Sequence, residues 1–138
     1  MQVKSFAIWA NAEKEQVPAL VQSTIKWAND NNLEVYLADR LKSIDVDSEV
    51  SYFSSQNPPE VDFLLCFGGD GTLISGVRIF SDPSVPVLGV HLGGLGFLAQ
   101  ITPEVLIDKL ESVKNNEFKI QDRLVLSAKI SGNEDSYY

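Results

Sequence analysis

A run of apolar residues followed at once by a cluster of glycines constrains the fold of this 138-residue chain more than any other feature. Val61–Phe67 is almost continuously apolar, which is typical of a strand buried on both faces of a parallel sheet. The sequence Gly68-Gly69-Asp70-Gly71-Thr72 follows directly, and helical spacing of apolar residues continues over Thr72–Phe80. A strand, a glycine turn and a helix in this order predict one unit of an open α/β sheet.

The remainder of the first two-thirds of the chain repeats this alternation. The other predicted elements are strands at Val3–Trp9, Leu33–Ala38 and Val85–Val90, a helix at Val17–Ala28, and a helix after Thr102 that is capped by Thr102, begins at Pro103 and ends before Asn115. The acidic segment Asp39–Glu60 is predicted to be mostly loop. Residues 1–117 are therefore predicted to form one α/β domain, with an open and mostly parallel sheet flanked by helices.

The carboxyl-terminal segment has a different pattern. Apolar and polar residues alternate from Phe118 to Ile130, which indicates a strand half-buried in an antiparallel sheet. The short, polar segment Ser131–Tyr138 offers it no hairpin partner. We expect residues 118–138 to begin a second, all-β domain that is mostly missing; the alternative is an edge strand of the main sheet.

Composition excludes several classes of function. The formal net charge is −8 with 11 Lys and Arg residues, which argues against nucleic acid or an anionic membrane as a partner. One cysteine and one histidine provide neither a disulfide nor a zinc-type ligand set, so we assign no residues to a metal site formed by the protein alone. No apolar run approaches the roughly 18 residues of a membrane span, and we expect a cytoplasmic protein.

The Gly68–Thr72 loop is the strongest candidate site. Ligands of open α/β sheets bind at the carboxyl ends of the strands, where glycines allow positive φ and bring main-chain N–H groups close to an anion. We expect Thr72 to cap the next helix, whose amino terminus favours phosphate. Asp70 is predicted to be a general base for a hydroxyl, a ligand of phosphate-bridging Mg²⁺, or both. The alternative is a turn residue that only accepts main-chain N–H bonds.

A second glycine-rich loop, Gly89–Leu98, follows the strand predicted at Val85–Val90. It falls at the same edge of the sheet, so both loops are expected to face one crevice. Phe97 is predicted either to lie against a flat base or to fill the core beneath the loop. His91, where this loop leaves its strand, is predicted to contact a ligand or to be a structural residue.

These residues resemble a known family. Phe67–Leu73, Pro86–Leu98 and the Thr102-Pro103-Glu104 helix start, with the spacing between them, are similar to the amino-terminal half of the NAD kinases. Lipid kinases and phosphofructokinases share the Gly-Gly-Asp-Gly core, but Leu95-Gly96-Phe97-Leu98 is similar to the NAD-kinase version of the second loop.

The resemblance implies phosphoryl transfer from ATP, or from polyphosphate, to the 2′-hydroxyl of the adenosine ribose of NAD, which gives NADP. It implies Mg²⁺ or another divalent cation, NAD and ATP as partners, and a homo-oligomer in the full-length protein. Asp70 corresponds to the general base of the family. The implied nucleotide-binding residues are Gly68, Gly69, Asp70, Gly71, Thr72, Gly94, Gly96 and Phe97.

The sequence departs from the family pattern at three positions. Family members usually have Asn in place of His91, commonly Arg or His in place of Gly94, and in some cases a basic residue in place of Ser75. The change at Gly94 puts nucleotide affinity or donor preference in doubt rather than the class of reaction.

The family's carboxyl-terminal β-sandwich supplies an Asn-Glu or Asn-Asp pair to the site. Asn133-Glu134 falls in a polar loop, so we interpret it as a decoy and expect the true pair beyond Tyr138. The chain is therefore expected to be a fragment with little activity alone. The alternatives are a lipid or sugar kinase that shares the Gly-Gly-Asp-Gly-Thr loop, and a non-catalytic nucleotide-binding module.

Overall fold

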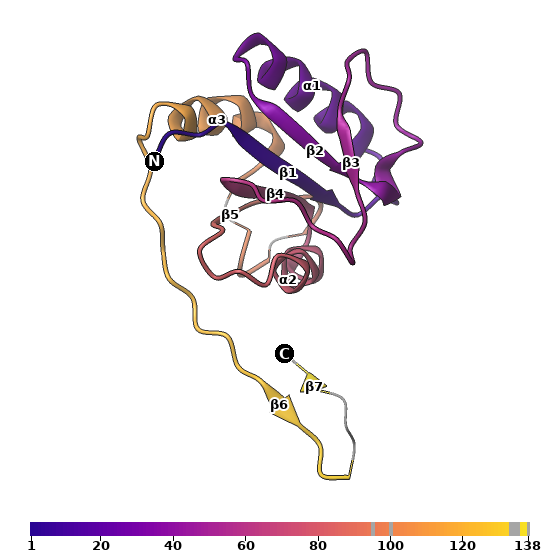
Figure 1. Ribbon diagram of the computed structural model, residues 1–138, viewed down its shortest axis with the longest axis vertical. Helices are drawn as coiled ribbons and strands as arrows, with labels where there is room; N and C mark the ends of the chain where they lie inside the picture. Colours follow the sequence, from indigo (N-terminus) through magenta and orange to yellow (C-terminus); the bar gives the residue numbers. More distant parts are fainter. Residues whose placement is uncertain (95, 100, 133–135, 138) are drawn as a thin grey trace.

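Five parallel strands form the central sheet, in the order β3-β2-β1-β4-β5 (Figure 1). The computed structural model describes residues 1–94, 96–99, 101–132 and 136–137. The strands are β1 (Ser5–Ala10), β2 (Glu34–Ala38), β3 (Ser51–Phe53), β4 (Phe63–Gly68) and β5 (Val87–His91). This arrangement confirms the predicted open, parallel α/β sheet.

Helices cover both faces of the sheet. α1 (Val17–Asp30) and α3 (Leu106–Lys114) lie on one face and α2 (Asp70–Ile79) lies on the other (Figure 1). The indole Nε1 of Trp27 on α1 donates a hydrogen bond to Oε1 of Glu111 on α3 at 2.6 Å, so these two helices lie side by side. Two short 3-10 helices, η1 (Asp39–Leu41) and η2 (Pro103–Val105), complete the connections.

The core lies between the central strands and the helices. Every residue of β4 is buried, as expected for a strand covered on both faces. Phe6 of β1 stacks on Phe63 of β4, with ring centroids 4.9 Å apart. Burial raises the pKa of the Cys66 thiol to about 12, so this cysteine is a core residue rather than a nucleophile.

Several element boundaries differ from the sequence predictions. The segment Asp39–Glu60, predicted as mostly loop, contains β3. This strand has only three residues, too few for an alternating pattern to be recognised in the sequence. α2 begins at Asp70 with Gly69 at the N-cap, so the prediction that Thr72 caps this helix is wrong. Thr102 makes no capping bond through its side chain, and Pro103 begins a 3-10 turn before α3 starts at Leu106.

The prediction for Phe118–Ile130 is also wrong in part. Only β6 (Ala128–Lys129) is a strand, and it pairs antiparallel with β7 (Ser136–Tyr137), so a hairpin partner does exist. The segment leaves the body as an extended, exposed chain and does not join the main sheet (Figure 1). Its apolar face finds nothing to pack against among the described residues. The Asn133-Glu134 pair lies outside them.

None of the described helices has the length and apolar character needed to cross a membrane.

Candidate functional site

The two glycine loops leave neighbouring strands at one point of the sheet. Gly68 at the end of β4 is the register partner of His91 at the end of β5. The N–H of Leu92 then donates to the carbonyl oxygen of Gly68 at 3.0 Å. Parallel pairing therefore places both loops at the same carboxyl edge, as the sequence predicted.

Gly68, the first glycine of the first loop, has the expected positive φ, at 158°. A Cβ on Gly68 would collide with the side chain of Thr72. Gly69 has a φ of −100° and Gly71 lies within α2, so the expectation of positive φ at these two positions is wrong. Helix α2 instead begins inside the motif, which brings the carboxylate of Asp70 into its first turn.

Asp70 joins the two loops. Its Oδ2 accepts a hydrogen bond from the main-chain N–H of Phe97 at 2.9 Å, and its Oδ1 accepts one from Leu98 at 3.0 Å. These two bonds, with a weaker one from Ala99, hold the pKa of Asp70 below its ordinary value despite some desolvation. The structure thus contains the contacts of the turn-residue alternative, although they come from the second loop rather than from its own turn.

The second loop places its predicted residues unequally. Gly96 approaches the Asp70 carboxylate, whereas Gly94 is exposed and a Cβ there would have no atom within 4 Å. The side chain of Phe97 is 92% exposed, so it does not fill the core beneath the loop. The prediction that Phe97 fills the core is therefore wrong, and its contact with a flat base stays a prediction.

His91 borders a small pocket beside the second loop. The pocket has a volume of about 180 Å³ and its lining residues are Gln16, His91, Leu92, Gly93, Thr102, Pro103 and Glu104. Nδ1 of His91 is buried without a hydrogen-bond partner among the described residues. The carboxylate of Glu104 is held ionised, with a lowered pKa, by its own N–H and by the Thr102 hydroxyl.

Lys14 and Arg40, two basic residues near this edge, were not singled out from the sequence. Nζ of Lys14 lies 3.9 Å from the position that a Cβ on Gly93 would occupy. The guanidinium of Arg40 lies 4.3 Å from the ring centroid of Trp9. Each follows a strand at its carboxyl end, and that position in the predicted topology was the signal available in the sequence.

Ser75, one of the positions that depart from the family pattern, has a structural partner. The indole Nε1 of Trp9 donates to Oγ of Ser75 at 2.9 Å, and this hydroxyl donates to the carbonyl oxygen of Thr72 at 2.8 Å. The serine therefore connects β1 to the first turns of α2.

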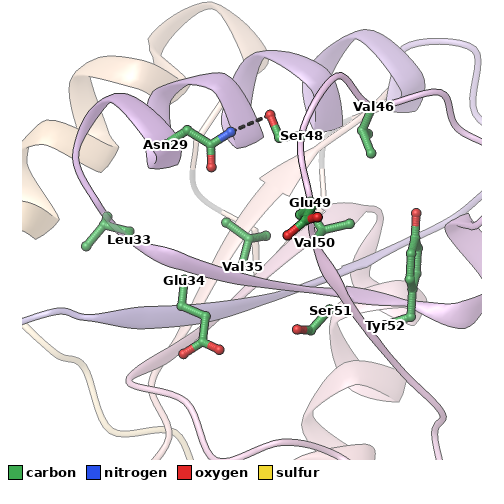
Figure 2. A pocket seen from close by; sticks show the side chains of 10 residues that line it. All are labelled: Asn29, Leu33, Glu34, Val35, Val46, Ser48, Glu49, Val50, Ser51 and Tyr52. Atoms are coloured by element: carbon green, nitrogen blue, oxygen red, sulfur yellow. Dashed lines mark hydrogen bonds between the residues drawn. The ribbon is translucent and has the colours of Figure 1, made fainter.

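A larger pocket of about 580 Å³ lies away from both glycine loops, where β2 and β3 begin. Figure 2 shows its lining, in which Asn29 of α1 donates a hydrogen bond to Ser48. Glu34 and Glu49 also line it, and no basic residue does. The carboxylates would repel phosphate groups, so this larger pocket is a poorer candidate for a nucleotide than the carboxyl edge.

No group of three or more His, Cys, Asp or Glu side chains is arranged to hold a metal ion in the part of the chain that the structure describes. Asp70 is the carboxylate that lies between the two glycine loops. Such a group suits Mg²⁺ when substrate phosphates and water supply the remaining ligands.

A parallel sheet with two glycine loops that meet at an acid on its carboxyl edge defines an α/β ligand-binding domain. A family model described as the ATP-NAD kinase N-terminal domain matches residues 6–118. The chain therefore belongs to the NAD kinase family.

Individual relatives agree with this assignment. The chain is 37% identical over 126 residues to an NAD kinase of Syntrophotalea carbinolica, covering 91% of this chain and 44% of that protein. It is 35% identical over 132 residues to an NAD kinase of Sulfurimonas denitrificans, covering 96% and 46%. The chain thus spans about half the length of these relatives.

Solved structures show the same fold. A crystal structure of yeast NADH kinase complexed with NADH superimposes with a TM-score of 0.69 at 19% identity, covering 85% of this chain and 39% of that one. An NAD kinase from Archaeoglobus fulgidus in complex with ATP gives a TM-score of 0.53 at 19% identity, covering 81% and 37%.

Proposed function

We propose that this chain forms the nucleotide-binding part of an enzyme that transfers a phosphoryl group from ATP to the 2′-hydroxyl of the adenosine ribose of NAD, giving NADP. The observation that carries the proposal is the meeting of both glycine loops at Asp70. Membership of the NAD kinase family and the names of the relatives support it. They favour NAD as the acceptor over the lipid or sugar substrates of other kinases with a Gly-Gly-Asp-Gly loop.

In this proposal Asp70 accepts the proton of the acceptor hydroxyl as the general base. Phosphoryl transfer is mostly a matter of positioning and charge neutralisation. The first turn of α2, which contains Gly71 and Thr72, offers main-chain N–H groups to phosphate. Gly68 and Gly69 lie toward the phosphates, and Gly69 has open space around it. Gly71, Gly96 and the exposed ring of Phe97 line the dinucleotide pocket, and Gly94 also binds the nucleotide.

The donor is ATP, with polyphosphate as the alternative, and a divalent cation such as Mg²⁺ would neutralise the donor phosphates. Asp70 would hold that cation together with the phosphates, because a single carboxylate plus phosphates is a common Mg²⁺ ligand set. The cations of Lys14 and Arg40 lie at the same edge of the sheet and place positive charge there in a chain whose net charge is −8.

We also propose the context of this chain. Residues 1–117 act as the α/β nucleotide-binding domain, and residues 118–138 begin an all-β domain that completes the substrate site. The enzyme is cytoplasmic and assembles as a homo-oligomer, with no nucleic-acid or membrane partner. The exposed apolar residues of the extended segment, among them Leu124 and Leu126, support a missing partner for this segment.

Ligand titration by NMR tests the proposal directly. NAD and ATP are added separately to the ¹⁵N-labelled chain, with a sugar and a short-chain diacylglycerol as comparison acceptors. We expect NAD and ATP to shift the amide signals of residues 68–72 and 93–98, and the comparison acceptors to leave them unchanged. The proposed function would be contradicted if a comparison acceptor shifted these signals. It would also be contradicted if neither NAD nor ATP shifted them.

A further inference from the structure

Both oxygens of the Asp70 carboxylate accept hydrogen bonds from the second glycine loop. Each of its two oxygens accepts one main-chain N–H, Oδ2 from Phe97 at 2.9 Å and Oδ1 from Leu98 at 3.0 Å. Hydrogen bonds from N–H groups to a carboxylate are charge-assisted and stronger than neutral ones. They favour the ionised carboxylate and therefore oppose uptake of a proton by Asp70.

This contact depends on the absence of a side chain at Gly96. A Cβ at that position would lie 2.5 Å from Oδ1 of Asp70 and 2.9 Å from its Cγ, closer than a Cβ approaches other atoms. Any other residue at position 96 would therefore displace either the loop or the Asp70 carboxylate and separate the two. Gly94, two positions earlier in the same loop, has open space around the corresponding point.

The ends of the loop are fixed by main-chain hydrogen bonds. The N–H of His91 donates to the carbonyl of Ile101 at 3.0 Å, and that of Leu92 donates to Gly68. Phe97, between these anchors, has a side chain 92% exposed and contributes almost no packing. At Phe97 the loop is therefore held over Asp70 by hydrogen bonds rather than by a buried side chain.

We propose that Gly96 is a positioning residue that lets the N–H groups of Phe97 and Leu98 clamp Asp70, and that this clamp opens when a ligand hydroxyl reaches the carboxylate. The inference rests on the proposed function in taking Asp70 as the base. A general base works best when its pKa is near the operating pH, and the clamp holds the pKa of Asp70 low. Opening the clamp therefore removes the N–H bonds that favour the ionised carboxylate and makes Asp70 a stronger base.

The clamp itself is tested without ligand, by NMR titration of the Asp70 carboxyl and hydrogen exchange of the Phe97 and Leu98 amides. We expect Gly96→Ala to raise the pKa of Asp70 toward its ordinary value and to speed exchange of both amides about tenfold or more. Gly94→Ala, the same change in open space, should leave both readouts as in the wild type. Equal behaviour of the two variants, or wild-type amides that already exchange freely, would overturn the proposal.

A second variant guards against misfolding of Gly96→Ala. Asp70→Asn keeps the size of the side chain but replaces one acceptor oxygen with an NH₂ group. We expect one of the two amides, Phe97 or Leu98, to lose protection while the amides of β4 stay protected. Full protection of both amides in Asp70→Asn would count against the clamp.

Addition of NAD to the wild-type chain tests the opening. We expect the Phe97 and Leu98 amides to lose protection as the Asp70 signal shifts. If NAD shifted the Asp70 signal while both amides stayed protected, the two hydrogen bonds would persist in the complex. That result would overturn the proposed opening of the clamp. An absence of any NAD effect on residues 68–72 and 93–98 contradicts the proposed function instead, and the ligand-free variants then decide the clamp alone.

Discussion

Oδ2 of Asp70 accepts a hydrogen bond from the main-chain N–H of Phe97 at 2.9 Å, although 27 positions separate the two residues in the sequence. This bond connects the loop after β4 to the loop after β5. It also makes the candidate catalytic acid part of the loop structure, so a change at Asp70 has a structural as well as a chemical consequence.

Replacement of the Asp70 carboxylate is the first test of its chemistry. In an active kinase that contains this chain, Asp70→Asn should lower the rate of NADP formation by about 10²–10⁴-fold, because the general base is lost while the size of the side chain is kept. The rate is measured with an NADP-dependent coupled assay. Near-normal turnover would leave Asp70 a purely structural acid.

The free energy of unfolding should fall at acid pH, because carboxylates with a lowered pKa in the folded state become protonated. Hydrogen bonds from Lys114 and Trp27 lower the pKa of Glu111, so its contribution to stability is present above the unfolded value of about 4.3 and is lost as pH falls through the lowered folded value. We measure the free energy of unfolding with urea at pH values from about 5 to about 3, the range in which carboxyl groups titrate. We expect this free energy to fall less in Glu111→Gln than in the wild type. An unchanged pH profile would mean that Glu111 stabilises the folded state equally in both protonation states.

Gly89 should tolerate no side chain. A Cβ there would lie 2.5 Å from Cδ1 of Leu73 and 3.1 Å from the main-chain Cα of Ala99. Gly89→Ala should therefore lower the free energy of unfolding by about 1–3 kcal/mol, as overpacked core sites do. Urea denaturation followed by circular dichroism measures this change.

Gly71→Ala is the matched control for Gly89→Ala. Gly71 lies in α2 and a Cβ there meets nothing within 4 Å. Alanine favours a helix over glycine by up to about 1 kcal/mol, so this variant should be as stable as the wild type or more stable. If both alanine variants were equally destabilised, glycine would be required at position 71 for a reason that the contacts in the structure do not explain.

The extended segment should contribute nothing to the stability of the body. Leu124 is 87% exposed and Leu126 is 72% exposed, so neither packs on the α/β domain. Removal of residues 120–138 should leave the urea midpoint unchanged and abolish any concentration-dependent association seen by light scattering. A lower midpoint in the truncated chain would mean that the segment packs on the domain in solution.

Catalysis by the chain alone should be negligible. The chain spans about half the length of the relatives that it matches, and the proposal assigns further substrate contacts to an all-β domain. A coupled assay for NADP formation with saturating NAD, ATP and Mg²⁺ measures this. Robust turnover would show that residues 1–138 contain all the groups that the reaction needs.

The sequence by itself determined the parallel sheet and the edge at which the candidate site lies. The apolar run of β4 and the glycines after it are local features, because burial on both faces and a tight turn each depend on neighbouring residues. The second loop was also predictable, since the end of a parallel strand fixes its edge. Phe97, in contrast, had two interpretations, because exposure depends on what lies beneath a loop.

Only the tertiary structure decided how these parts meet. Helix α2 begins at Asp70 rather than at Thr72, and β3 adds an outer strand whose three residues carry too little pattern to read. The engagement of Asp70 by Phe97 and Leu98, and the need for glycine at position 96, arise from contacts between distant segments. Periodicity records which face of an element is buried, but the distance between two loops depends on how the strands beneath them pair and pack.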